Sequence, residues 1–87
     1  MTHYQKEDLL HRKIEDRCFV VNQKKGTLID LNKVSFFLWK QLVKPLKNTS
    51  LIKILIKEYD VERKQAIKDV NSFLKKAIKS GIIKKIK

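Results

Sequence analysis

Few side chains in this sequence are of the types that perform chemistry. The two histidines, His3 and His11, have neither a cysteine nor another histidine at a spacing suited to metal ligation, so we interpret both as solvated surface residues. Asp30 and Asp69 interrupt apolar or basic surroundings and could in principle share acid–base work. Each also has lysines nearby, and an ion pair is the simpler role. The sequence therefore predicts no catalytic site and no metal site.

The glycines and the cysteine have structural explanations. Gly26 and Gly81 are the only glycines, and a turn and a helix end account for them, so the sequence has no glycine-rich phosphate loop. Cys18 is the only cysteine, and we expect it to be a small buried hydrophobe on a strand. A disulfide framework is excluded, and we expect no cofactor.

Charge favours an acidic partner. The 21 basic residues against 9 acidic ones give a formal net charge of +12, which suits an anionic peptide, an acidic enzyme surface, nucleic acid or a membrane. The three arginines, Arg12, Arg17 and Arg63, leave 18 lysines, a bias that an AT-rich coding sequence would also produce. Both interpretations of the charge stay open. So few arginines count against sequence-specific DNA binding, which relies on the guanidinium fork.

Length and hydrophobicity limit the architecture. With 87 residues, 43% of them hydrophobic, the chain is long enough for one domain over residues 1–87 and too short for a second core. Residues 1–8 are polar and charged, and we expect them to be flexible. No apolar run approaches the ~20 residues of a membrane span, so we expect a cytoplasmic protein that does not enter a membrane.

Residues 9–31 read as strands. Within residues 17–31, an apolar run at residues 18–21, a polar turn that ends at Gly26, and a second run at residues 27–31 predict a β-hairpin. Residues 10–14 alternate more weakly and permit a third strand.

Residues 32–83 read as a three-helix unit. Asn32 is a good N-cap for a helix that should end near Val43, because Pro45 disfavours helical geometry before it. Thr49 can cap a second helix of about ten residues, and a third should run over residues 63–80 to Gly81, at the position after the C-cap. The tail, residues 82–87, either adds a strand or covers the core. The fold class is α+β, a small antiparallel sheet followed by three helices in a winged helix-turn-helix arrangement, and the expected core contains Phe37, Trp39, Leu55, Val70 and Phe73.

Two surfaces of this arrangement could bind a partner. Residues 27–31 contain no proline or lysine, and Asp30 is the one charged residue that could discourage pairing with another strand. This edge strand therefore suits β-augmentation, in which a peptide adds a strand to the sheet. The alternative is that residues 10–14 or a second protomer already cover the edge. The third helix carries a basic stripe, which is either a solvated face or the recognition helix of a DNA-binding winged helix. Only seven residues follow that helix from Gly81, too few for the usual wing. The stripe consists of Lys64, Lys68, Asn71, Lys75 and Lys79.

The sequence resembles the PqqD-like family over roughly residues 17–83. The most specific features are Leu31-Asn32 with Leu38-Trp39 seven residues on, and Asp69-Val70 followed by Phe73-Leu74. Further matching positions are Gly26 to Asp30, Phe37, Thr49, Ile52, Leu55, Glu58 to Val61, Ala66, Gly81 and Ile82. Two positions depart from the pattern. Val43-Lys44 stands where the family often has Asp-Gly, and the bulky Phe36 stands where a smaller residue is usual.

This resemblance implies a stand-alone module that binds the leader of a ribosomally made precursor peptide and serves a peptide-modifying enzyme. The leader, expected to be acidic, would add a strand to the backbone of Thr27, Leu28, Ile29, Asp30 and Leu31. By the same resemblance, the groove side chains are Asp69, Phe73, Lys76 and Ala77.

The resemblance leaves the partner enzyme open. A radical S-adenosylmethionine enzyme, a lasso-peptide leader protease and another tailoring enzyme all fit. The alternatives for the function are a winged-helix nucleic-acid-binding protein and a purely structural subunit. Which alternate residues of the Thr27–Leu31 strand face a ligand is not readable from the sequence.

Overall fold

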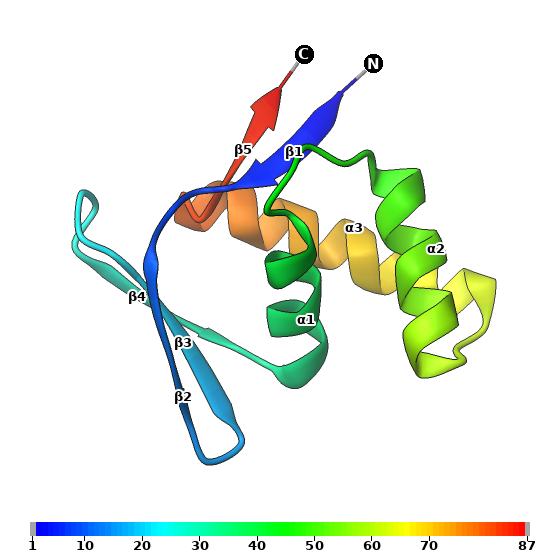
Figure 1. Ribbon diagram of the computed structural model, residues 1–87, viewed down its shortest axis with the longest axis horizontal. Helices are drawn as coiled ribbons and strands as arrows, with labels where there is room; N and C mark the ends of the chain where they lie inside the picture. The colour runs from blue at the N-terminus through cyan, green and yellow to red at the C-terminus, as the bar shows by residue number, and fades with distance from the viewer. Residues whose placement is uncertain (1, 87) are drawn as a thin grey trace.

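The computed structural model describes residues 2–86 and confirms the α+β class. Four strands come first, β1 (His3–Lys6), β2 (Leu10–Ile14), β3 (Arg17–Asn22) and β4 (Thr27–Leu31). The helices α1 (Lys33–Gln41), α2 (Asn48–Tyr59) and α3 (Arg63–Ser80) follow, and β5 (Ile83–Ile86) comes last (Figure 1). The predicted hairpin and the weaker third strand both form, in an antiparallel sheet of order β2-β3-β4.

The N-terminal segment differs from its prediction. We expected residues 1–8 to be flexible, but β1 pairs antiparallel with β5, and Tyr4 lies opposite Lys85. Tyr4 and Leu46 also exchange backbone hydrogen bonds, with N to O distances of 2.7 and 2.9 Å. The tail therefore adds a strand, because β1 supplies its partner from the other end of the chain (Figure 1).

Local signals set most of the helix ends. The Asn32 side-chain oxygen accepts a hydrogen bond from the Ser35 amide at 2.8 Å, as an N-cap should, and α1 ends at Gln41 ahead of Pro45. Gly81 ends α3 in the left-handed conformation, with φ of 74°, and is the C-cap itself rather than the residue after it. Glycine adopts this conformation without the steric penalty of a Cβ atom.

The start of α2 was predicted wrongly. The helix begins at Asn48, with Lys47 at the N-cap position, so Thr49 lies inside the first turn and caps nothing. No side-chain hydrogen bond caps this helix end. The hydroxyl of Thr49 was a reasonable signal, but Leu46 forms a β-bridge with Tyr4 and the helix begins two residues later, at Asn48.

The core lies between the helices and one face of the β2-β3-β4 sheet. Trp39 is fully buried, and its indole Nε1 donates a hydrogen bond to the Ile82 carbonyl at 3.0 Å. Phe37 is only partly buried and packs edge-on against Tyr59, with ring centroids 5.3 Å apart. The other four predicted core residues are buried as expected, and Cys18 is buried as a free thiol. Among residues 2–86, no helix is both long and apolar enough to cross a membrane.

Candidate functional site

Strand β4 forms an edge of its sheet. The order β2-β3-β4 places β2 on the far side of β3, so residues 10–14 do not cover β4. Within residues 2–86, β3 is the only strand that pairs with β4. The backbone groups on the other side of β4 are therefore available to a further strand.

The register reveals which amides of β4 point to this free edge. Glu15 and Asp16 form a two-residue turn between β2 and β3, and the residues that flank such a turn hydrogen-bond to each other. The direction of the backbone hydrogen bonds then alternates along β3, so that residues 17, 19 and 21 hydrogen-bond to β2 while residues 18, 20 and 22 hydrogen-bond to β4. Residues 18, 20 and 22 lie opposite Leu31, Ile29 and Thr27. The backbone groups of Leu28 and Asp30 therefore point to the free edge.

The side chains of β4 alternate between two faces. Leu31 is buried against the core, and Thr27 and Ile29, which share its face, are half-buried. Leu28 and Asp30 point to the other face, where Leu28 is exposed. A strand added to β4 would continue this alternation, with one set of its side chains towards the helices and the other away from them.

Two shallow hollows lie between the end of β4, the start of α1 and α3. One, of about 360 Å³, is lined in part by Asp30, Leu31 and Lys76. The other, of about 280 Å³, is lined in part by Asp69, Phe73 and Lys76. Because Lys76 and Asn32 border both hollows, we treat them together as the β4–α3 groove. The remaining lining residues are Asp16, Arg17, Lys33, Val34, Ser35 and Ser72.

The β4–α3 groove brings together most of the residues predicted for it. Phe73 is buried and gives the groove an apolar floor, whereas Lys76 is exposed at its rim. Ala77 is buried in the core and lines neither hollow. Val34 and Ser35 also line the groove, and the family resemblance did not predict them. The N-cap residue Asn32 was the one feature of the sequence that marked the start of α1, where both residues lie.

The two aspartates that stood out in the sequence have partners other than lysine. Asp30 forms an ion pair with Arg17, and both side chains are well exposed. Asp69 accepts a hydrogen bond from the Gln65 side chain at 2.8 Å. The two aspartates lie on different elements, and each has its own partner.

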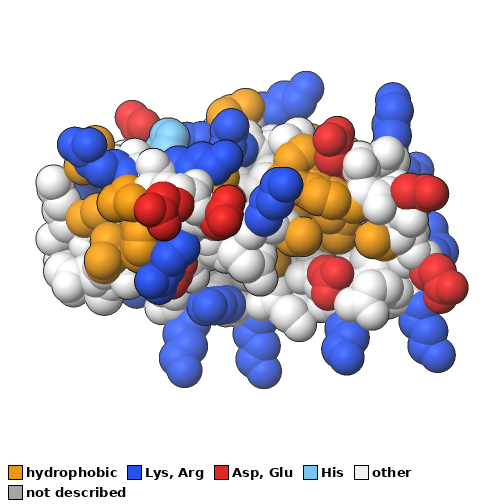
Figure 2. Space-filling model, turned by 90° about the horizontal axis from the view of Figure 1, so that it is seen from below, with side chains coloured by type: hydrophobic (Ala, Val, Ile, Leu, Met, Phe, Trp, Pro, Cys, Tyr) orange, Lys and Arg blue, Asp and Glu red, His pale blue; other side chains and the backbone are white. Residues whose placement is uncertain are grey.

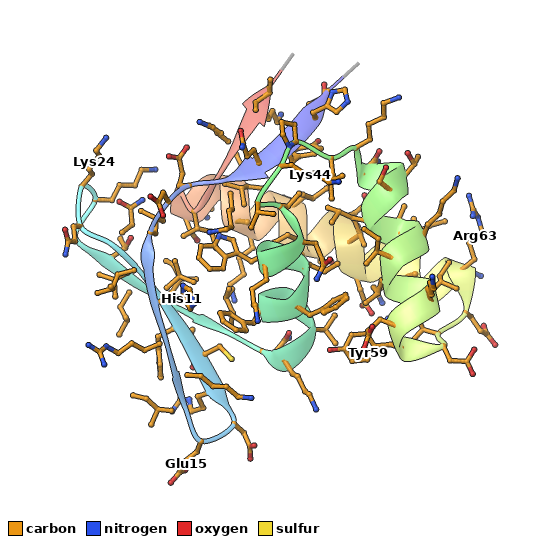
Figure 3. All side chains as sticks on the ribbon, viewed as in Figure 1. His11, Glu15, Lys24, Lys44, Tyr59 and Arg63 are labelled. Atoms are coloured by element: carbon orange, nitrogen blue, oxygen red, sulfur yellow. The ribbon has the colours of Figure 1, made fainter. Side chains whose placement is uncertain are left out.

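Histidine His11 is exposed, as expected, but its ring is not free of contacts. It lies over α1, where its ring centroid is 5.6 Å from that of Phe36 and 5.3 Å from that of Trp39 (Figure 3). In residues 2–86, no cluster of three histidine, cysteine or acidic side chains could hold a metal ion.

Two other surfaces lie away from the groove. A larger hollow, of about 670 Å³, is at the opposite end of the sheet, where Leu10, Val21 and the turn at Lys24 border it. None of the groove residues is in its lining. The basic stripe of α3 is exposed along its whole length, as a solvated face would be.

Comparison with known proteins identifies the family. A family model described as coenzyme PQQ synthesis protein D (PqqD) matches residues 17–83. The chain belongs to the PqqD family. The match runs from β3 to the start of β5, so it includes β4, α3 and the whole β4–α3 groove, whereas β1 and β2 precede it. No curated protein matches the chain.

Two solved structures share the fold of this PqqD-family chain. One is TbiB1 in complex with the TbiA(β) leader peptide, with 20% identity and a TM-score of 0.76 over 92% of this chain and 94% of that chain. The other is lasso peptide synthetase B1 complexed with the leader peptide, with 16% identity and a TM-score of 0.75 over 93% of this chain and 96% of that chain.

Proposed function

We propose that this chain is a peptide-binding module that takes up the leader of a ribosomal precursor peptide by strand addition to β4 and presents it to a modifying enzyme. The free β4 edge beside the β4–α3 groove carries this proposal. Leu28 and Asp30 would supply the backbone partners of the leader. The ligand side chains that point towards the helices would then rest on Phe73 and meet Lys76 at the rim.

Charge supports an acidic leader. The β4–α3 groove is lined by three basic and three acidic side chains, so the support comes from the net charge of +12 over the whole chain and not from the groove itself. Such a field speeds the encounter with an anionic peptide and is weakened by salt. The two solved structures of this fold, both complexes with leader peptides, add support from outside the chain.

The proposal makes the chain a carrier rather than an enzyme. The chemistry would belong to a partner such as a radical S-adenosylmethionine enzyme or a leader protease, both of which act on peptides that need to be recognised and held. Ribosomal precursor peptides are made in the cytoplasm, and the proposal places the chain there.

A titration tests the proposal directly. The probe is a fluorescently labelled acidic peptide with the leader sequence of a candidate ribosomal precursor, with a scrambled peptide of the same composition as its control. We expect saturable binding of the native leader and weaker binding of the scrambled one. In NMR spectra of the chain, the native leader should shift the amide signals of β4 and of the second half of α3. Equal binding of both peptides would reduce the interaction to charge attraction and overturn the proposal.

Duplex DNA serves as the competing ligand in the same assay. Binding that comes only from lysine–phosphate attraction should fall steeply with salt and ignore sequence. Tight, sequence-selective binding at physiological salt would make the chain a nucleic-acid-binding protein instead.

A further inference from the structure

The β2-β3-β4 sheet has a second face that points away from the helices, which we call the outer face. The register places Leu10, Val21 and Leu28 side by side across the three strands. In residues 2–86 the exposed large hydrophobic side chains are Leu10 (56% exposed), Ile14 (58%), Leu28 (63%) and Val43 (65%). Three of these four lie on the outer face. Its members are Leu10, Arg12, Ile14, Arg17, Phe19, Val21, Leu28 and Asp30.

The apolar side chains of the outer face are separate from the core. None of its five hydrophobic residues belongs to the core cluster or to the partly buried side chains that pack against it. Figure 2 shows hydrophobic side chains gathered over the sheet end of the molecule, at the left, apart from those over the helices. A contiguous apolar patch of this kind on a small domain marks a surface that binds a partner.

The composition of the outer face is that of a protein interface. The sequence has 18 lysines, yet no lysine is a member of this face, whereas two of the three arginines are. The Arg17 guanidinium lies over the Phe19 ring, 5.3 Å from its centroid, and also pairs with Asp30. Interface centres are enriched in aromatic residues and arginine and depleted of lysine.

The charges on the outer face and on the whole chain indicate which kind of protein binds to this face. Asp30 already neutralises Arg17, and no carboxylate of residues 2–86 pairs with Arg12. An acidic side chain opposite Arg12 would complete this surface. A second copy of the chain would instead bring another net charge of +12 against it, which opposes association.

We propose that the outer face docks an apolar surface with an acidic rim on the peptide-modifying enzyme, while the β4 edge holds the leader. This inference rests on the proposed function. The outer face is continuous with the β4 edge through Leu28 and Asp30, so an enzyme docked there lies next to the leader that it modifies. Strand addition at β4 leaves the outer face open and extends it by the outward side chains of the leader.

Variants of β2 test the docking face without touching the ligand edge. β2 is separated from β4 by β3, so we choose the double variant Leu10→Glu with Ile14→Glu, and Arg12→Glu as a second variant that keeps the hydrophobic side chains. Val43→Glu is the matched control, because Val43 is equally exposed and lies outside the sheet. The probes are the labelled leader peptide of the titration above and a purified enzyme that modifies the same precursor, and circular dichroism verifies that each variant folds.

We expect both β2 variants to bind the enzyme at least about tenfold more weakly than the wild type, as loss of an interface centre does. Their affinity for the leader should stay within about twofold, and Val43→Glu should change neither affinity. Enzyme binding that is unaffected in both β2 variants, or absent from the wild type, would overturn the docking face. A dimer of this chain that the β2 variants dissociate would assign the face to a second copy. Absence of leader binding in the wild type would instead refute the proposed function itself.

Discussion

Proline substitutions at two adjacent positions of β4 should separate ligand binding from folding. The register points the amide of Leu28 to the free edge and the amide of Ile29 to Val20 on β3. Leu28→Pro therefore removes a donor to the leader and leaves a ligand carbonyl without its partner. Proline is tolerated at such an edge position because the sheet itself loses no hydrogen bond.

The two variants should differ clearly in magnitude. An unpaired carbonyl costs about 1–3 kcal/mol, so Leu28→Pro should weaken leader binding by roughly five- to 150-fold with little change in the melting temperature. Ile29→Pro breaks the β3–β4 ladder and disturbs a half-buried side chain, which should cost about 2–4 kcal/mol. For a domain of this size, that loss lowers the melting temperature by roughly 10–30 °C.

Fluorescence anisotropy with a labelled leader measures the affinity, and thermal melts followed by circular dichroism measure the stability. Leu28→Ala is the control, since it trims an exposed side chain and keeps the amide. If Leu28→Pro unfolds the domain and Ile29→Pro does not, the assignment of the edge amides is reversed. If both proline variants fold and bind the leader with unchanged affinity, strand addition at β4 is wrong.

Three further substitutions have defined outcomes. Phe73→Ala should destabilise the domain by about 3–5 kcal/mol, and an unchanged melting temperature would show that the ring is dispensable to the core. Trp39→Phe should cost about 0.5–1.5 kcal/mol in chemical denaturation, because the buried Ile82 carbonyl loses the indole donor but still accepts a hydrogen bond from the Glu7 amide at 3.0 Å; unchanged stability would show that the indole hydrogen bond contributes nothing. In stopped-flow binding, Lys76→Glu should slow association with an acidic leader, less so at high salt, whereas Lys75→Glu, outside the groove, should slow it less; equal effects would make the steering a property of net charge alone.

The sequence by itself determined the features that depend on neighbouring residues. The hairpin of β3 and β4 and the cap at Asn32 follow from a few adjacent side chains, and so does the extent of α3 up to Gly81. The start of α2 is an exception, because the helix begins at Asn48, before the Thr49 hydroxyl that marked it in the sequence, and no side chain caps it. The family resemblance also needed only the order of residues along the chain, and the PqqD family model matches over the same range.

Only the tertiary structure decided which distant segments meet. β1 appeared flexible because its partner, β5, lies at the other end of the chain, and strand pairing over such a separation leaves no local signal. The free amides of Leu28 and Asp30 follow from a register that runs through all three strands from the turn at Glu15. The β4–α3 groove and the outer face have the same origin, because each is formed where side chains from separate elements are placed side by side by packing.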